Sequence, residues 1–230
     1  MVKRAIDGNA LRAAVLGAND GLVSNFSLVM GVAGASVGNG PVVVAGIAGL
    51  LAGSLSMALG EWLSVQSSRE LYANQIAIEA AQLEAFPEHE EEELRVIYEA
   101  KGLGADEARR LAHRILSGDR AGALDTIARE ELGINPDDLG GSAWTAAVTS
   151  FVLFATGAIV PLVPFLVGSG FGAIAVSAAL SGAALFLLGA AITRMTGREP
   201  LRAGLRQLGF GLAAAAITYG IGALLGTTVV

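Results

Sequence analysis

The chain has 230 residues, a net charge of −6 and a mean hydropathy of +0.59, with 53% hydrophobic and only 16% charged residues. Soluble domains carry roughly 25% charged residues and give each surface helix a polar face, so this composition excludes an ordinary soluble domain and predicts an all-α integral membrane protein. Cysteine is absent, which excludes disulfides, thiolate-bound zinc and cysteine nucleophiles and leaves oxygen, imidazole or thioether ligands for any metal.

The first apolar segment covers residues 13–35 and contains one charged residue, Asp20. It is long enough to span a bilayer. No basic segment with a short apolar core and an Ala-x-Ala cleavage site precedes it, so we expect no cleaved signal peptide. The segment 36–41 contains Gly and Pro, is typical of a turn, and ends this first predicted helix.

A second apolar segment begins at Val42 and continues past Trp62, with Glu61 as its one charged residue. From Ser64 onward the sequence becomes polar, yet Gly and Pro are absent until Pro87. Since nothing in that stretch would end a helix, we expect the second transmembrane helix to continue out of the membrane as a polar stalk.

An acidic insert follows, because residues 69–140 contain 17 Asp and Glu against 8 Lys and Arg. Segments 88–100, 105–117 and 119–133 are separated by Gly residues and predict short soluble helices. We therefore expect a small helical domain after the second transmembrane helix. The predicted domains are 1–68 with transmembrane helices 1 and 2, 69–140 as the acidic helical metal-binding domain, and 141–230 with transmembrane helices 3 to 5.

Three further apolar segments, at about 142–167, 171–193 and 204–226, bring the predicted number of transmembrane helices to five. Basic residues precede the first helix and lie between the last two, whereas the loops 36–41 and 167–170 carry no charge. The positive-inside rule therefore predicts a cytosolic amino terminus, a cytosolic acidic insert and an external carboxyl terminus. The basic residues are Lys3, Arg4, Arg12, Arg194, Arg198, Arg202 and Arg206.

Asp20 and Glu61 are candidate site residues, because an ionisable side chain inside a span costs at least a few kcal/mol and usually faces a cavity or a partner. Met57 lies four residues before Glu61, so both project from one face of the second helix. A carboxylate with a thioether suits a borderline cation such as iron(II) better than magnesium or calcium. The alternatives are packing by Met57 and a structural Asp20 carboxylate bonded to Asn19 or Asn25.

The acidic insert offers a second candidate metal site. Glu79 and Gln82 are three residues apart, as are Glu90 and Glu93, so each pair shares a helix face. A third helix could add Glu130 and complete an oxygen cage for divalent cations. Like charges this close destabilise one another unless a cation neutralises them; the alternative is a solvated acidic helix.

The sequence lacks the motifs that other classes of function require. No phosphate-binding Gly-rich loop occurs, and no Glu-x-x-His pair of a di-iron oxidase is present, so we expect neither an enzyme nor a prosthetic group. His89 and His113 are lone histidines, more typical of solvated side chains, and an acidic insert would repel nucleic acid. A non-transporting, membrane-anchored metal sensor or scaffold remains the alternative to a transporter, since it would need the insert but not the intramembrane carboxylates.

Two segments, RAAVLGANDGLVSNFSLVMGVAGA at 12–35 and SLSMALGEWLSVQSS at 54–68, resemble the vacuolar iron transporter family, as does REELGI at 129–134. The resemblance covers nearly the whole chain. It implies a homodimer with five spans per subunit and an ion path at the dimer interface. It also implies a proton-coupled antiporter that exports iron(II), and sometimes manganese(II), from the cytosol, in a bacterial plasma membrane or a eukaryotic vacuolar membrane.

Matching this pattern residue by residue implies intramembrane ligands at Asp20 and Met57, with Glu61 nearby on the path. In the insert, where other divalent cations could also bind, Gln82 stands where the family often has glutamate, and Thr126 and Ile127 stand where it has methionines. These departures leave the number and softness of the cytosolic sites open. The matching acidic positions are Glu79, Glu90, Glu93 and Glu130.

Overall fold

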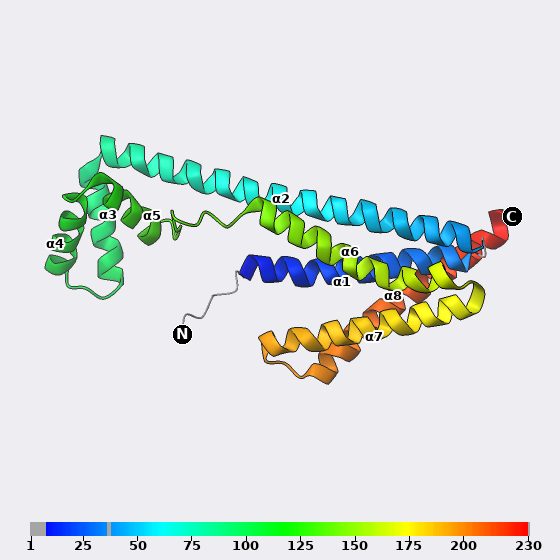
Figure 1. The fold of residues 1–230 in the computed structure, drawn as a ribbon. Helices are drawn as coiled ribbons and strands as arrows, with labels where there is room; N and C mark the ends of the chain where they lie inside the picture. The colour runs from blue at the N-terminus through cyan, green and yellow to red at the C-terminus, as the bar shows by residue number, and fades with distance from the viewer. Residues whose placement is uncertain (1–7, 36–37, 230) are drawn as a thin grey trace. The chain divides into compact units, whose positions relative to one another are not determined.

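The structure is a computed structural model that describes residues 8–35 and 38–229, and the side chains of 15–35, 38–193 and 197–226. Every regular element within these residues is an α-helix (Figure 1). Lys3, Arg4 and the side chains of Arg12 and Arg194, used above to predict orientation, lie outside the described residues. The helices are α1 (Gly8–Gly34), α2 (Asn39–Ala85), α3 (Pro87–Ala100), α4 (Ala105–Leu116), α5 (Arg120–Glu130), α6 (Ala143–Val167), α7 (Gly170–Thr196) and α8 (Pro200–Val229).

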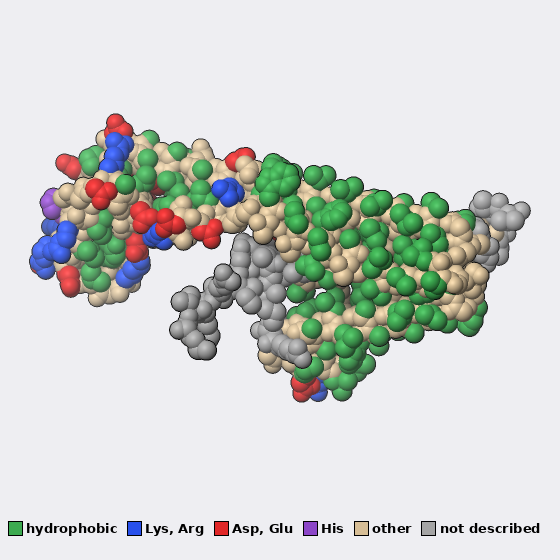
Figure 2. All heavy atoms as spheres, viewed as in Figure 1, with side chains coloured by type: hydrophobic (Ala, Val, Ile, Leu, Met, Phe, Trp, Pro, Cys, Tyr) green, Lys and Arg blue, Asp and Glu red, His purple; other side chains and the backbone are tan. Residues whose placement is uncertain are grey.

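The chain forms two compact units. The membrane unit consists of Met1–Trp62 and Trp144–Val230, and the acidic unit consists of Leu63–Ala143. Hydrophobic side chains cover the visible face of the membrane unit, whereas acidic and basic side chains gather on the acidic unit (Figure 2). Helix α2 contributes to both units without a break over 47 residues, more than twice the roughly 20 residues that a span requires. The predicted continuation of this helix past Ser64 is thus confirmed.

Within the described residues, four helices are long and apolar enough to cross a membrane. They are α2, α6, α7 over Gly170–Thr193 and α8 over Pro200–Gly226. They confirm an all-α, multi-pass membrane protein. Helix α1 carries Asn19, Asp20 and Asn25 within its apolar sequence and is not among the four. The count of five spans therefore stays a prediction.

Helix α1 nevertheless contributes the centre of the membrane unit's core. Its side chains Phe26, Val29 and Met30 are at most 3% exposed. They belong to one buried cluster with a residue from each of the four apolar helices. Because α1 packs against all four candidate spans and covers part of the apolar face of each, it would lie in the same environment as they do. The residues from the other helices are Val42, Phe165, Ala173 and Ala215.

Glycine makes the contacts of α1 possible. A Cβ atom at Gly21 would overlap the backbone carbonyl of Phe154 on α6, and one at Gly222 of α8 would overlap the carbonyl of Gly31. Glycine has no side chain and so lets two helix backbones approach this closely. In lipid, where the hydrophobic effect does not hold helices together, such close van der Waals packing does. Both of these close approaches are contacts within one chain.

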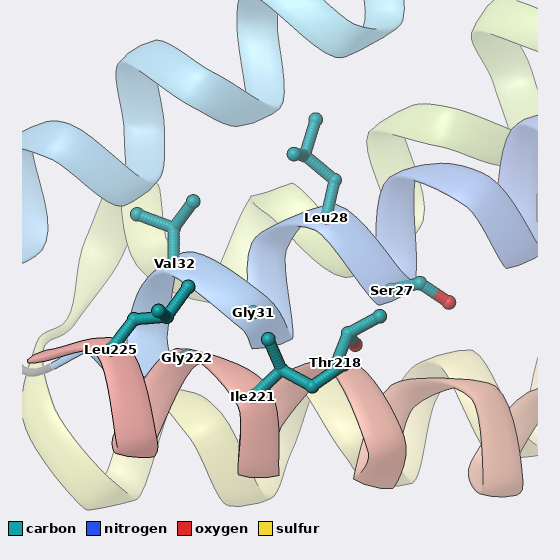
Figure 3. A pocket seen from close by; sticks show the side chains of 8 residues that line it. All are labelled: Ser27, Leu28, Gly31, Val32, Thr218, Ile221, Gly222 and Leu225. Carbon is teal, nitrogen blue, oxygen red and sulfur yellow. The ribbon is translucent and has the colours of Figure 1, made fainter.

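A small cavity of about 260 Å³ lies where α1 and α8 run side by side (Figure 3). Its lining includes the side chains of Leu28 and Leu225 and the hydroxyl-bearing Ser27 and Thr218. The Thr218 hydroxyl donates to backbone carbonyls of its own helix, so the cavity presents an almost wholly apolar surface. We assign it to packing.

Trp62 of α2 and Trp144 of α6 form an edge-to-face pair with ring centroids 6.1 Å apart. They lie at the ends of the two chain segments that make up the membrane unit. Tryptophan is enriched at the boundary between hydrocarbon and water, so this pair is a natural marker for one edge of the membrane-embedded region.

In the acidic unit, α3, α4 and α5 pack with the end of α2. Leu94, Ala112 and Ile127 are fully buried at its centre, and Leu83 of α2 packs against them. Helix α5 is capped by Asp119, whose Oδ1 accepts a hydrogen bond of 2.8 Å from the Gly122 amide, a contact that satisfies one of the free amides of a first turn. The three predicted short helices correspond to α3, α4 and α5, the last of which ends at Glu130.

Candidate metal centre

Three glutamates of the acidic unit form a candidate metal centre. Glu79 lies on α2, Glu90 on α3 and Glu131 directly after α5, and each offers a carboxylate oxygen within 4.8 Å of the other two. Glu79 is 8% exposed and Glu90 only 1%. In the described part of the chain, no other three acidic or histidine side chains come this close. Oxygen ligands alone suit a hard or borderline divalent cation.

The helix phase of the acidic unit explains why these carboxylates converge. Side chains four residues apart lie on the same helix face. Each glutamate is four residues from an apolar side chain of the unit's core, so the packing that buries the core also turns the three carboxylates inward. The pairs are Glu79 with Leu83, Glu90 with Leu94, and Glu131 with Ile127.

The buried carboxylate oxygens lack partners. Both oxygens of Glu90, Oε2 of Glu79 and Oε2 of Glu131 are shielded from solvent and accept no hydrogen bond from the described residues. Burying charge without compensation costs several kcal/mol. A cation or bound protons would supply the missing partner.

Burial also shifts the protonation of these groups. It raises the pKa of Glu90, and the charges of Glu79 and Glu93 add to the rise. It raises the pKa of Glu131 to about 8, helped by a hydrogen bond with Glu93 and by the surrounding carboxylates. The cation-free centre therefore binds protons more tightly than free glutamates do, and a metal ion would displace them.

The remaining sequence candidates of the insert lie outside this group of three. Glu130 forms an ion pair with Lys101, and Gln82 is exposed. Glu93 is half-buried beside the centre, and its Oε1 lies 3.3 Å from Nε2 of His89. His113 contacts a different carboxylate, with Nδ1 3.0 Å from Oε2 of Glu91.

Glu131 is the ligand candidate that residue matching missed. The signal was present in the pattern of α5, because Ile127 and Ala128 are both fully buried and lie four and three residues before Glu131. Position 131 therefore continues the inward face of the helix. Glu130 is rotated away from that face and reaches Lys101 instead.

The intramembrane candidates are placed differently. Asp20 is exposed on α1, while Met57 and Glu61 are half-buried on α2. The two amides considered as partners of Asp20 bond elsewhere: Asn25 Nδ2 donates to the Ala158 carbonyl at 2.6 Å, and Asn19 Oδ1 accepts from Gln207. A structural role for Asp20 through those amides thus gains no support within a single chain.

Asp20 lies on a face of α1 that the chain leaves uncovered. Leu16 and Leu28 are 49% and 39% exposed, and with the exposed Ser24 and Asp20 they recur every four residues. A carboxylate that faced lipid in such a row would be costly. We therefore expect Asp20 to face a water-filled cavity or the surface of a second protein chain.

Comparison with known proteins gives matches across both units. The profile of the VIT family matches residues 11–223. Vacuolar iron transporter 1 of Arabidopsis thaliana is 31% identical over 213 residues, which cover 92% of this chain and 84% of that protein. A vacuolar iron transporter of Acanthamoeba castellanii is 35% identical over 222 residues, covering 93% and 78%. Vacuolar iron transporter homolog 1 of Oryza sativa subsp. japonica is 34% identical over 221 residues, covering 94% and 74%.

Proposed function

Because this chain belongs to the VIT family, a family of transporters and not of enzymes, we propose that it exports iron(II), with manganese(II) as a second cargo, from the cytosol in exchange for protons. Relatives named as iron transporters support metal ion transport by a multi-pass membrane protein. Iron, the direction of transport and the coupling to protons are the proposed parts.

The observation that carries this proposal is the group of three converging carboxylates, Glu79, Glu90 and Glu131, of which the first two are buried. Their unpartnered oxygens and the raised pKa of Glu131 favour a centre that exchanges protons for a divalent cation. With Glu93 beside it, this centre collects cations on the cytosolic side of the membrane, because clustered negative charge raises their local concentration.

Within the membrane, we assign the ion path to Asp20, Met57 and Glu61. A metal ion and a proton compete there for the same carboxylate oxygens, and the Met57 thioether adds a donor that favours iron(II) over magnesium or calcium. Asp20 is uncovered in a single chain, so a second copy of the chain would complete the path at a homodimer interface. Helix α2 also carries an exposed apolar row, with Leu51, Leu55 and Leu59 at 49%, 53% and 69% exposure.

The orientation follows from the distribution of charge. Arg198 between α7 and α8 and Arg202 and Arg206 in the first turns of α8 are exposed, and basic residues next to a span remain on the cytosolic side. This distribution supports the proposal that the amino terminus and the acidic unit are cytosolic. The host membrane would be the plasma membrane of a bacterium or the vacuolar membrane of a eukaryote.

The test is flux in proteoliposomes that contain the purified protein and a pH-sensitive dye. We expect iron(II) to cross the membrane, protons to move in the opposite direction, and an imposed pH gradient to accelerate the flux. Metal binding without any flux would instead support the alternative, a membrane-anchored metal sensor or scaffold, since the three-glutamate centre lies wholly within the acidic unit.

A further inference from the structure

A basic cavity of about 750 Å³ lies where α7 ends and α8 begins. Its charge comes from Arg198, Arg202 and Arg206, and in the described lining Glu199 is the only acidic residue. Arg202 Nε lies 2.9 Å from Glu199 Oε2, with the two side chains 85% and 67% exposed, so solvent screens this pair. We propose that this cavity binds the phosphate group of an anionic phospholipid headgroup.

The geometry of the three arginines suits a phosphate. Arg202 and Arg206 are four residues apart in α8, so they lie on one face of that helix, and Arg198, which precedes the helix, lines the same cavity. A guanidinium group donates two parallel hydrogen bonds to phosphate oxygens, which a lysine ammonium cannot do. Within the described residues, no ion pair occupies Arg198 or Arg206, so both are available to an external anion.

The start of α8 adds to this preference. The helix begins at Pro200, and the amides of its first turn together with the helix dipole favour an anion at that end. Arg198 and Arg202 flank this turn, so charge and dipole act on the same volume.

The length of α8 places the cavity at the level of lipid headgroups. The part of α8 with described side chains, Pro200–Gly226, has 27 residues and includes Arg202 and Arg206; it is about 40 Å long at 1.5 Å per residue, whereas the hydrocarbon core of a bilayer is about 30 Å thick. The excess corresponds to about two turns. Leu201 and Leu205 in these turns are 63% and 52% exposed and alternate with Arg202 and Arg206, so lipid tails and headgroups both find a matching surface.

A second basic cavity provides a matched control. It measures about 770 Å³, lies on α4 and is lined by Arg109, Arg110 and Arg114. It has the same number of arginines and one acidic lining residue, Glu91, but it lies in the acidic unit, on helices that are not candidate membrane spans. A lipid headgroup with its tails would therefore prefer the α7–α8 corner.

The experiment measures lipid retention and thermal stabilisation of the purified full chain in mild detergent, with phosphatidylglycerol compared with phosphatidylcholine. The wild type should prefer phosphatidylglycerol, and R198Q/R202Q/R206Q should lose that preference, at roughly fivefold in affinity for each arginine. R109Q/R110Q/R114Q should keep it. A preference that survived in the first triple variant, or vanished in the second, would overturn the proposal.

Two further measurements test the proposal if the first variant does not fold or if the bound anion is not a lipid. If the glutamine variant does not fold, R198K/R202K/R206K retains the charge that orients the chain but lacks the guanidinium fork. It should then show a preference reduced by about two- to threefold, and an unchanged preference would contradict a built phosphate site. Inorganic phosphate is the other arm: if it stabilises the wild type and phosphatidylglycerol does no better than phosphatidylcholine, the cavity binds a soluble anion and the lipid assignment is wrong.

Discussion

The carboxylates of Glu90 and Glu131 come within 4.8 Å of each other from two different helical segments of the acidic unit. Glu90 is only 1% exposed, and the charges that surround the pair are those of Glu79 and Glu93. Two carboxylates held this close can both ionise only if a cation lies between them or near them. Protons or a metal ion therefore decide the charge state of the centre.

The first prediction separates two adjacent glutamates. Glu131→Gln should weaken iron(II) binding by the full chain about tenfold or more, equivalent to ~1.4 kcal/mol, because it removes one of three converging oxygens. Glu130→Gln, which only breaks an exposed pair with Lys101, should change binding little. Anaerobic calorimetry measures both, and equal losses in the two variants would show that the centre is not built on Glu131.

The second prediction concerns pH and the cation-free protein. The pKa of Glu131 is raised from 4.5 to about 8, so between these values the folded state holds a proton that the unfolded state has lost. The contribution of this group to stability is thus complete below pH 4.5 and is lost as pH rises through 8. Thermal unfolding in detergent should show the wild type losing stability towards alkaline pH more steeply than Glu131→Gln. Parallel curves would contradict the assigned shift.

The third prediction tests the membrane path. Asp20→Asn preserves size but removes the charge and the exchangeable proton, so iron(II) flux and its response to a pH gradient should disappear together. Asp106→Asn, at an exposed acidic position on α4, should leave both intact. Proteoliposome flux reports the result after the variant is shown to be folded. Near wild-type flux with proton counterflow in Asp20→Asn would remove Asp20 from the mechanism.

The fourth prediction concerns helix packing. Gly222→Ala should destabilise the membrane unit by about 1–3 kcal/mol, because the new methyl group would overlap the backbone carbonyl of Gly31. Gly220→Ala, on the same helix but with nothing within 4 Å of its Cβ position, should be neutral or mildly stabilising. Thermal unfolding of the two variants gives the comparison, and similar unfolding temperatures would contradict the close contact of α1 and α8.

The fifth prediction is topological and uses the absence of cysteine from the chain. In intact cells, single cysteines introduced at Gly38 or Gly170 should react with an impermeant reagent added outside, and one at Asp119 should not. Reaction at Asp119 would place the acidic unit on the other side and reverse the proposed direction of transport.

Local sequence pattern was sufficient for much of the architecture. Long apolar segments, interrupted by Gly and Pro at their ends, predicted the membrane helices, and the uninterrupted stretch from Ser64 to Pro87 predicted the continuation of α2. These properties follow from residues close together in the chain, because helix formation and partition into a bilayer depend on composition over about 20 residues. The family resemblance, carried by residues 12–35 and 54–68, is confirmed by the match to the VIT family.

Tertiary structure alone decided which charged residues meet. Glu130 and Glu131 are neighbours of the same type, and their different roles depend on how α5 rotates to bury Ile127 and Ala128. Successive residues of a helix point about 100° apart. For this reason Glu130 forms an ion pair with Lys101, whereas Glu131 lies in the acidic centre. Convergence of three helical segments is a property of packing between distant parts of the chain, which no local pattern specifies.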